Sequence, residues 1–167
     1  REAVAIAIDK EEIALGATNG YATPTEAGIT PLCPQAPKDF KGLERDVERA
    51  KQLVAEAGYP NGVDITMRII GASNYTKPAE VVQAQLKEIG INLSIEPMER
   101  ASWFDLCYTG GDYEISIYAN AVQVLDADFG AYPFLHSSEL NGGNNYMAIN
   151  NPELDELLDK ARISDDE

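Results

Sequence analysis

Two carboxylates, Asp126 and Asp128, stand two positions apart in the otherwise largely apolar stretch from Ala119 to Phe129. A carboxylate near a cleft and without cationic neighbours can hold an ammonium group, because hydrogen bonds between charged partners are strong. Helix capping is the alternative, since either aspartate could accept the first amides of a short helix that starts near Phe129. The sequence leaves both interpretations open.

Catalytic chemistry has little support in the sequence. Paired carboxylates can perform acid–base catalysis when their environments separate their pKa values. No serine, histidine and acid stand in a recognisable nucleophile motif, and the GG steps at 110–111 and 142–143 lack the flanking pattern of a phosphate loop. We therefore expect that the chain is not an enzyme and that it needs no cofactor.

The chain also lacks the spacing of a metal site. It has two cysteines, Cys33 and Cys107, and one histidine, His136, and none of them has a neighbouring cysteine or histidine. We therefore expect no metal ion, and we interpret His136 as a surface or capping residue. The two cysteines form either one disulfide, which requires an oxidising compartment, or two free thiols.

The stretch from Asp46 to Ile70 organises the chain, because it predicts a helix, a sharp stop and a strand. Asp46 can cap the helix, and apolar residues then recur at spacings of three and four. Gly58 suits a left-handed C-terminal position, and Pro60 forbids continuation. Alternating apolar and polar residues predict the strand over 64–70.

Further helices and strands follow in alternation. Strands are predicted from Ile91 until Pro97 closes the strand, and over 113–117. One predicted helical segment covers 1–15, with a break and a cap at Asp9, and a second helix runs from a cap at Thr76 to Gly90. A short helix is predicted over 102–108, with Trp103 in the core. The last predicted helix follows Asn151 and has an apolar stripe from Leu154 to Ala161. Residues 17–43 are rich in proline and predict an irregular surface loop. Strands separated by helices indicate an α/β fold, with a mixed, largely parallel sheet flanked by helices.

A ligand of such a fold is expected outside the carboxyl ends of the strands, where the connecting loops gather. Three loops meet this condition: 71–75, 97–100 and 119–129. The candidate ligand-binding residues in or beside these loops are Ser73, Asn74, Tyr75, Tyr118, Asn120, Asp126 and Asp128. A solvated turn explains the composition of the first loop equally well.

Length and charge limit the remaining function classes. A chain of 167 residues is one domain by length, and no apolar run reaches the ~20 residues that cross a bilayer. The net charge of −15 argues against nucleic acid, whose binding depends on lysine and arginine. No signal peptide opens the chain, which reads as the middle of a longer protein.

Four segments carry a resemblance to a known family: REAVAIAIDKEEI at the start, the proline-rich TPTEAGITPLCPQAPKDFKG from Thr23, AKQLVAEAGYPNGVDITM from Ala50, and QLKEIGINLSIEPMERASWFDL from Gln85. They resemble, in the same order, the family 5 extracytoplasmic solute-binding proteins, which serve ABC importers of peptides and nickel. The resemblance implies a periplasmic-binding-protein-like fold, with residues 1–167 forming a single lobe, the C-terminal one of two. In peptide-binding members, an aspartate after the third strand holds the α-amino group of the peptide. Asp126 or Asp128 would take this place, although YANAVQVLDAD departs from the usual GWxxDYxDP.

The same resemblance implies a function. The chain would bind a small solute, expected to be a peptide, outside the cytoplasm and would deliver it to the permease subunits of the importer. Association with the membrane would depend on an N-terminal lipoprotein anchor outside this sequence, and no nucleic acid would be bound. The alternative is a ligand-sensing domain of a transcriptional regulator built on the same lobe.

Overall fold

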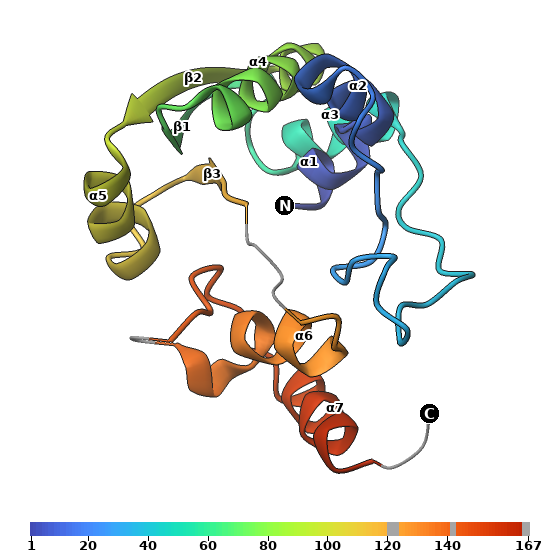
Figure 1. The fold of residues 1–167 in the computed structure, drawn as a ribbon. Coiled ribbons are helices and arrows are strands. Elements are labelled where there is room, and N and C mark those ends of the chain that lie inside the picture. Colours follow the sequence, from blue (N-terminus) through green and yellow to red (C-terminus); the bar gives the residue numbers. More distant parts are fainter. Residues whose placement is uncertain (120–123, 141–142, 165–167) are drawn as a thin grey trace. The chain divides into compact units, whose positions relative to one another are not determined.

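The computed structural model describes residues 1–119, 124–140 and 143–164 (Figure 1). The chain divides into two compact units. Unit 1 consists of Arg1–Pro24, Gly42–Trp103 and Tyr113–Tyr118, and unit 2 consists of Thr25–Lys41, Phe104–Asp112 and Ala119–Glu167.

A parallel sheet of three strands forms the centre of unit 1, with β1 between β2 and β3. The strands are β1 (Val63–Ile70), β2 (Ile91–Met98) and β3 (Ile115–Ile117). Because both pairings are parallel, the carboxyl ends of the strands lie at the same edge of the sheet. The predicted α/β fold with a largely parallel sheet is confirmed.

β2 continues past the proline that the sequence predicts as its end. Pro97 still pairs with Ile69 of β1, and the strand ends at Met98. Proline is tolerated here because β2 is an outer strand of the sheet, where a missing amide donor costs least.

Helices accompany the sheet in unit 1: α1 (Glu2–Ala7), α2 (Lys10–Thr18), α3 (Val47–Glu56), α4 (Ser73–Glu88) and α5 (Arg100–Trp103). Two predicted N-caps are confirmed. The carboxylate of Asp9 accepts the amide of Glu12 at 2.9 Å, and that of Asp46 accepts the amide of Arg49 at 2.8 Å.

The apolar core of unit 1 lies between α4 and the sheet. α4 contacts β2 and β1, and Figure 1 shows it running beside them. Val82 and Leu86 of α4 are buried, as the predicted helix face requires, and β1 contributes Met67 and Ile69. Each such side chain stabilises the fold by ~1.5–3 kcal/mol when it leaves water.

The N-terminus of α4 differs from the prediction. The sequence predicts a cap at Thr76, whereas the helix begins at Ser73, and no side chain caps it. Tyr75 accounts for the difference, because its side chain is only 5% exposed and its burial favours a helical first turn. Ser73, Asn74 and Tyr75 therefore belong to a helix and not to a polar loop.

Unit 2 consists of helices joined by irregular segments. Its helices are η1 (Phe104–Thr109, a π-helix), α6 (Ala127–Leu135), η2 (Ser137–Glu139, a 3-10 helix) and α7 (Pro152–Ile163). The predicted helix over 102–108 is thus divided between α5 and η1. Asn151 caps α7 by accepting the amide of Glu153 at 3.0 Å, as predicted. Cys33 and Cys107 are both buried and are not joined in a disulfide.

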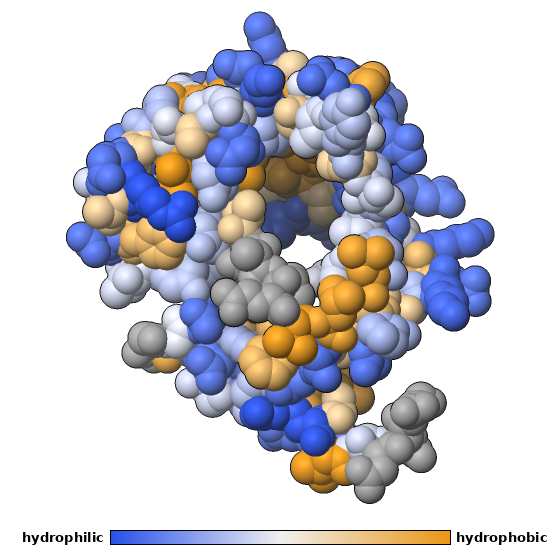
Figure 2. All heavy atoms as spheres, viewed as in Figure 1, coloured by the Kyte–Doolittle hydropathy of each residue, from blue (hydrophilic) through white to orange (hydrophobic). Residues whose placement is uncertain are grey.

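The face shown in Figure 2 is largely hydrophilic, in keeping with the net charge of −15, and it carries separate hydrophobic areas. In α7, Leu157 of the predicted stripe is 63% exposed, and Ile163, which lies beyond the stripe, is 83% exposed. The predicted apolar stripe of this helix is therefore only partly covered by the described residues. No described helix is both long and apolar enough to cross a membrane.

Candidate functional site

The carboxyl ends of the strands bring three segments of unit 1 to one edge of the sheet. Gly71 follows β1, Glu99 follows β2 and Tyr118 follows β3. Ile70 and Met98 pair at this edge, and the amide of Gly71 donates to the carbonyl of Met98 at 2.8 Å. We call Ser73, Asn74 and Tyr118, the candidate residues in these segments, the strand-end site.

Ser73 and Asn74 form the exposed first turn of α4. Besides these side chains, the turn presents the backbone amides of Ser73 and Asn74, for which a helix offers no acceptor, whereas the amides of Tyr75 and Thr76 donate to the carbonyl of Ala72 at 2.9 and 3.0 Å. Such groups can donate hydrogen bonds to the carbonyl or carboxylate oxygens of a solute. Tyr75, the third candidate in this segment, is buried in the core of unit 1 and does not face solvent.

The second loop, predicted over 97–100, is reduced to Glu99. Its carboxylate accepts the amides of Ala101 and Ser102, at 2.7 and 3.2 Å, and so caps α5. This loop therefore orients α5 and the residue at its end, Trp103.

Tyr118, the candidate residue at the end of β3, stacks on Trp103. The two ring centroids are 5.0 Å apart, and the ring planes differ by 20°. Trp103 is 0% exposed, which confirms the prediction that it belongs to the core, and its Nε1 donates to the carbonyl of Arg68 and to Oγ of Ser116, both at 3.2 Å. Tyr118 itself is half-buried.

The two aspartates of the third loop have structural partners in unit 2. Asp126 caps α6, because its carboxylate accepts the amide of Asp128 at 2.8 Å. The predicted capping role is confirmed for Asp126, and the helix begins at Ala127, before Phe129. Asp128 lies 3.0 Å from Nε of Arg162, so the expectation of no cationic neighbour is wrong for this residue. Asn120, the remaining candidate, lies outside the described residues.

His136 is buried, contrary to a surface position, but it does act as a cap. Its Nδ1 accepts the amide of Ser138 at 3.0 Å, and its ring stacks on Tyr132 with centroids 4.4 Å apart. Nε2 lies 3.5 Å from Asp159 and 3.9 Å from Asp155. These contacts join η2 to α6 and α7 within unit 2.

Asp155 is the carboxylate of this cluster with the most hydrogen bonds. The hydroxyl of Ser137 donates to it, and the amide of Ser137 donates to it at 2.9 Å. The hydroxyl bond, the amide bond and the nearby His136 hold the pKa of the Asp155 carboxyl below its ordinary value. These hydrogen bonds therefore attach α7 to η2.

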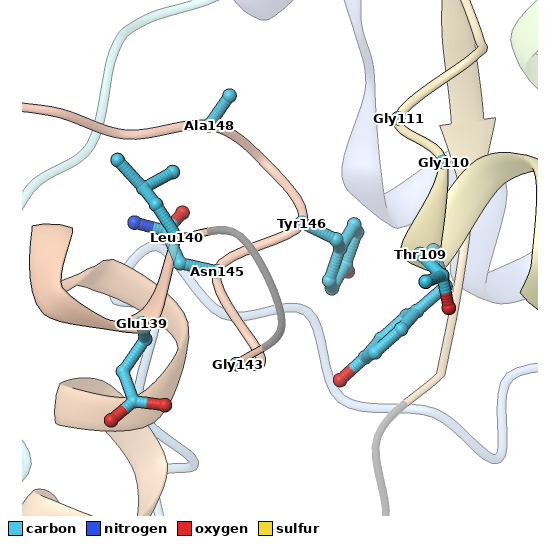
Figure 3. Close-up of a pocket in the computed structure, with 10 residues that line it drawn as sticks. Thr109, Gly110, Gly111, Glu139, Leu140, Gly143, Asn145, Tyr146 and Ala148 are labelled. Carbon is cyan, nitrogen blue, oxygen red and sulfur yellow. The ribbon is translucent and has the colours of Figure 1, made fainter.

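Unit 2 also contains a pocket of about 220 Å³ that the sequence did not predict. Figure 3 shows Leu140, Asn145 and Ala148 on one side, the segment from Thr109 to Gly111 on the other, and Tyr146 between them. The lining comes from two segments that are distant in sequence, and for this reason no periodicity could have revealed it.

The loop beside this pocket is organised by Asn145, which is 4% exposed. Its side chain donates to the carbonyls of His136 and Ile149, at 3.0 and 2.7 Å, and accepts the amide of Ile149 at 3.0 Å. Tyr146 stacks on Tyr108, with centroids 4.9 Å apart. The pocket is thus lined by two stacked tyrosines and by the hydrogen-bonded Asn145, and its volume suits a small group.

The chemistry available at these places is that of binding. The strand-end site offers the hydroxyl of Ser73, the amide of Asn74 and the ring of Tyr118. Tyr108 and Tyr146 line the pocket of unit 2. Among the described residues, no group of three or more His, Cys, Asp or Glu side chains could hold a metal ion.

Comparison with known proteins also indicates a binding protein. The family model described as bacterial extracellular solute-binding proteins, family 5 Middle, matches residues 1–142. Heme-binding protein A of Haemophilus influenzae is 31% identical over 166 residues, covering 96% of this chain and 30% of that protein. The oligopeptide-binding protein AppA of Bacillus subtilis is 29% identical, covering 99% of this chain and 33% of that protein.

A solved structure shares the fold as well. The periplasmic binding protein DppA of Helicobacter pylori, in complex with the peptide STSA, superposes with a TM-score of 0.88 at 25% identity, covering 98% of this chain and 32% of that chain. The chain thus spans about a third of the length of heme-binding protein A and of AppA. These proteins bind solutes, in agreement with the expectation that the chain is not an enzyme. The chain belongs to the bacterial extracellular solute-binding proteins of family 5.

Proposed function

We propose that this chain is part of the receptor of an ABC importer and that it binds the solute at the strand-end site. The observation that carries the proposal is the parallel sheet, whose carboxyl ends bring Ser73, Asn74 and Tyr118 to one edge. In open α/β sheets, ligands bind in the crevice outside the carboxyl ends of the strands, where the connecting loops and the helix N-termini lie.

A peptide is the solute class that we propose. The hydroxyl of Ser73, the side-chain amide of Asn74 and the backbone amides of these two residues complement the carbonyl and carboxylate oxygens of a peptide backbone. The ring of Tyr118 offers an apolar face to a side chain of the peptide. The relatives AppA and DppA, which are described as an oligopeptide-binding protein and as a peptide complex, support the same class.

The aspartates are proposed to contribute in different ways. Asp126 holds the start of α6 and reaches the solute only if its second oxygen is available. Asp128 is paired with Arg162, so an ammonium group that bound its carboxylate would compete with this guanidinium. A solute contact by Asn120, Asp126 or Asp128 stays a prediction, and the carboxamide or carboxylate of each would serve a peptide amine.

The setting of this function is also a proposal. We expect the chain to form most of one lobe, the C-terminal one, of a two-lobed receptor outside the cytoplasm. The receptor would deliver its solute to the permease subunits and would be held at the membrane by an N-terminal lipoprotein anchor. The family match and the share of about a third that the chain covers in these two relatives support a solute receptor larger than this chain, whereas the C-terminal position of the lobe and the lipoprotein anchor stay predictions.

The test uses the intact protein. It is purified without denaturation and examined by native mass spectrometry for a retained solute, then by calorimetry with the peptide STSA, a library of di- and tripeptides, and hemin. We expect a peptide to bind, and we expect Tyr118→Ala to weaken binding about tenfold, equal to ~1.4 kcal/mol.

Tyr59→Ala is the matched control, since Tyr59 is 49% exposed in the same unit but precedes β1 and lies at the amino ends of the strands. Equal effects of the two substitutions would contradict a site at the carboxyl ends. Binding of hemin without any peptide would contradict the proposed solute class.

A further inference from the structure

We propose that Trp103 is a positioning residue whose indole holds Tyr118 in place for the solute. The inference rests on the proposed function, because it assigns a task to a residue behind the strand-end site. Because Trp103 is 0% exposed, it cannot contact the solute itself and affects binding only through Tyr118, which is half-buried.

β3 needs support of this kind because it is short. It comprises Ile115–Ile117 and pairs with β1 alone in the described sheet. The register of β3 with β1 ends at Ile117 and Ile69, and Tyr118 is the next residue along the chain. Backbone pairing does not orient a ring about its χ angles, so side-chain contacts are needed to hold the ring of Tyr118 in one orientation.

The indole supplies these contacts from two directions. Its Nε1 donates to the carbonyl of Arg68 in β1 and to Oγ of Ser116 in β3, both at 3.2 Å. Oγ of Ser116 donates in turn to the carbonyl of Arg68 at 2.6 Å. With the polar edge fixed in this way, the face of the indole forms a rigid support for the ring of Tyr118.

The position of Trp103 is itself set by β2. α5 follows β2 directly and carries Trp103 as its last residue, and the carboxylate of Glu99 caps this helix. One indole therefore contacts β1 and β3 and is carried by the helix that follows β2. A ring that is held before the solute arrives loses less freedom on binding, which favours affinity.

The experiment uses the intact protein labelled with fluorotyrosine, and the Tyr118 resonance is assigned by Tyr118→Phe. Trp103→Leu removes the ring, and Trp103→Phe keeps a ring but lacks the Nε1 donor. We expect the Tyr118 resonance to shift or broaden in both variants. Leu86→Ala, at another position that is 0% exposed, serves as the control for general destabilisation and should leave the resonance unchanged.

Affinity for STSA, or for the peptide that binds the wild type best, provides the second readout. We expect Tyr118→Ala and Trp103→Leu each to weaken binding about tenfold, and the double variant to bind no more weakly than Tyr118→Ala alone. Losses that multiply to about a hundredfold in the double variant would overturn the inference, because Trp103 would then act independently of Tyr118.

An unchanged Tyr118 resonance in Trp103→Leu would also overturn it. If the leucine variant does not fold, Trp103→Phe decides by the same two measurements. Failure of the proposed function has a different signature, namely that the wild type binds no peptide. The resonance alone then decides whether Trp103 holds Tyr118.

Discussion

Two glycines show how single residues fix the amino ends of the strands. Gly62 and Gly90 have φ angles of +90° and +84°, and the carbonyl of Gly90 accepts the amide of Val63 at 2.9 Å. A Cβ added to Gly62 would lie 2.6 Å from that carbonyl oxygen. The AGYPNG segment, which carries much of the family resemblance, therefore serves the register of β1 and β2 and lies away from the strand-end site.

Gly62→Ala should consequently be costly, and Gly58→Ala is its matched control. Gly58 has a φ of +98° but nothing within 4 Å of an added Cβ, so alanine there should cost only the ~1–2 kcal/mol of a left-handed backbone. At Gly62 the clash with a backbone oxygen should add ~1–3 kcal/mol. Urea unfolding measures both, and equal losses would show that the contact between Gly62 and Gly90 is relaxed in solution.

The Asp155 carboxyl gives stability a dependence on pH. Its pKa is lowered in the folded state by Ser137, so it stabilises the fold above the unfolded-state pKa of about 3.9, and this stabilisation is lost as the pH falls through the folded-state pKa. Asp155→Asn should therefore lower the melting temperature at pH 7, and the gap to the wild type should narrow below about pH 4. Asp39→Asn, in an exposed loop, is the control. A gap that stays constant with pH would contradict the assignment.

At the scale of elements, the cap of α6 separates the two roles considered for Asp126. Asp126→Ala should destabilise the protein by ~1 kcal/mol, whereas Asp126→Asn, which can still accept the amide of Asp128, should cost less. Thermal unfolding measures this difference, and calorimetry with a bound peptide measures affinity. If Asp126→Asn keeps both stability and affinity, the residue is a cap alone. A selective loss of affinity would assign the carboxylate to the solute.

The elements also show which parts of the structure were accessible from the sequence. The caps at Asp9, Asp46 and Asn151 were predicted correctly because a cap depends on a few consecutive residues. The start of α4 was predicted wrongly because the burial of Tyr75 decides it, and burial depends on the rest of unit 1. The aromatic contact between Trp103 and Tyr118 depends likewise on tertiary packing.

At the scale of the molecule, the size of the chain limits what it can do alone. It covers 30% of heme-binding protein A and 33% of AppA, so about two-thirds of such a receptor lies outside it. Within it, Leu157 and Ile163 of α7 remain exposed, and the strand-end site offers contacts from unit 1 only. A solute held from one side keeps more contact with water and gains fewer of the contacts that offset its lost freedom.

The chain 1–167 should therefore bind its solute far more weakly than the intact protein. We expect calorimetry with the same peptide to give a dissociation constant at least about a hundredfold higher for the isolated chain, a difference of ~2.7 kcal/mol or more. Circular dichroism and a cooperative melting curve establish whether the isolated chain folds, since an unfolded chain would bind nothing for a trivial reason. Sub-micromolar binding by the folded chain would mean that one lobe suffices, and closure of a second lobe would then contribute little to affinity.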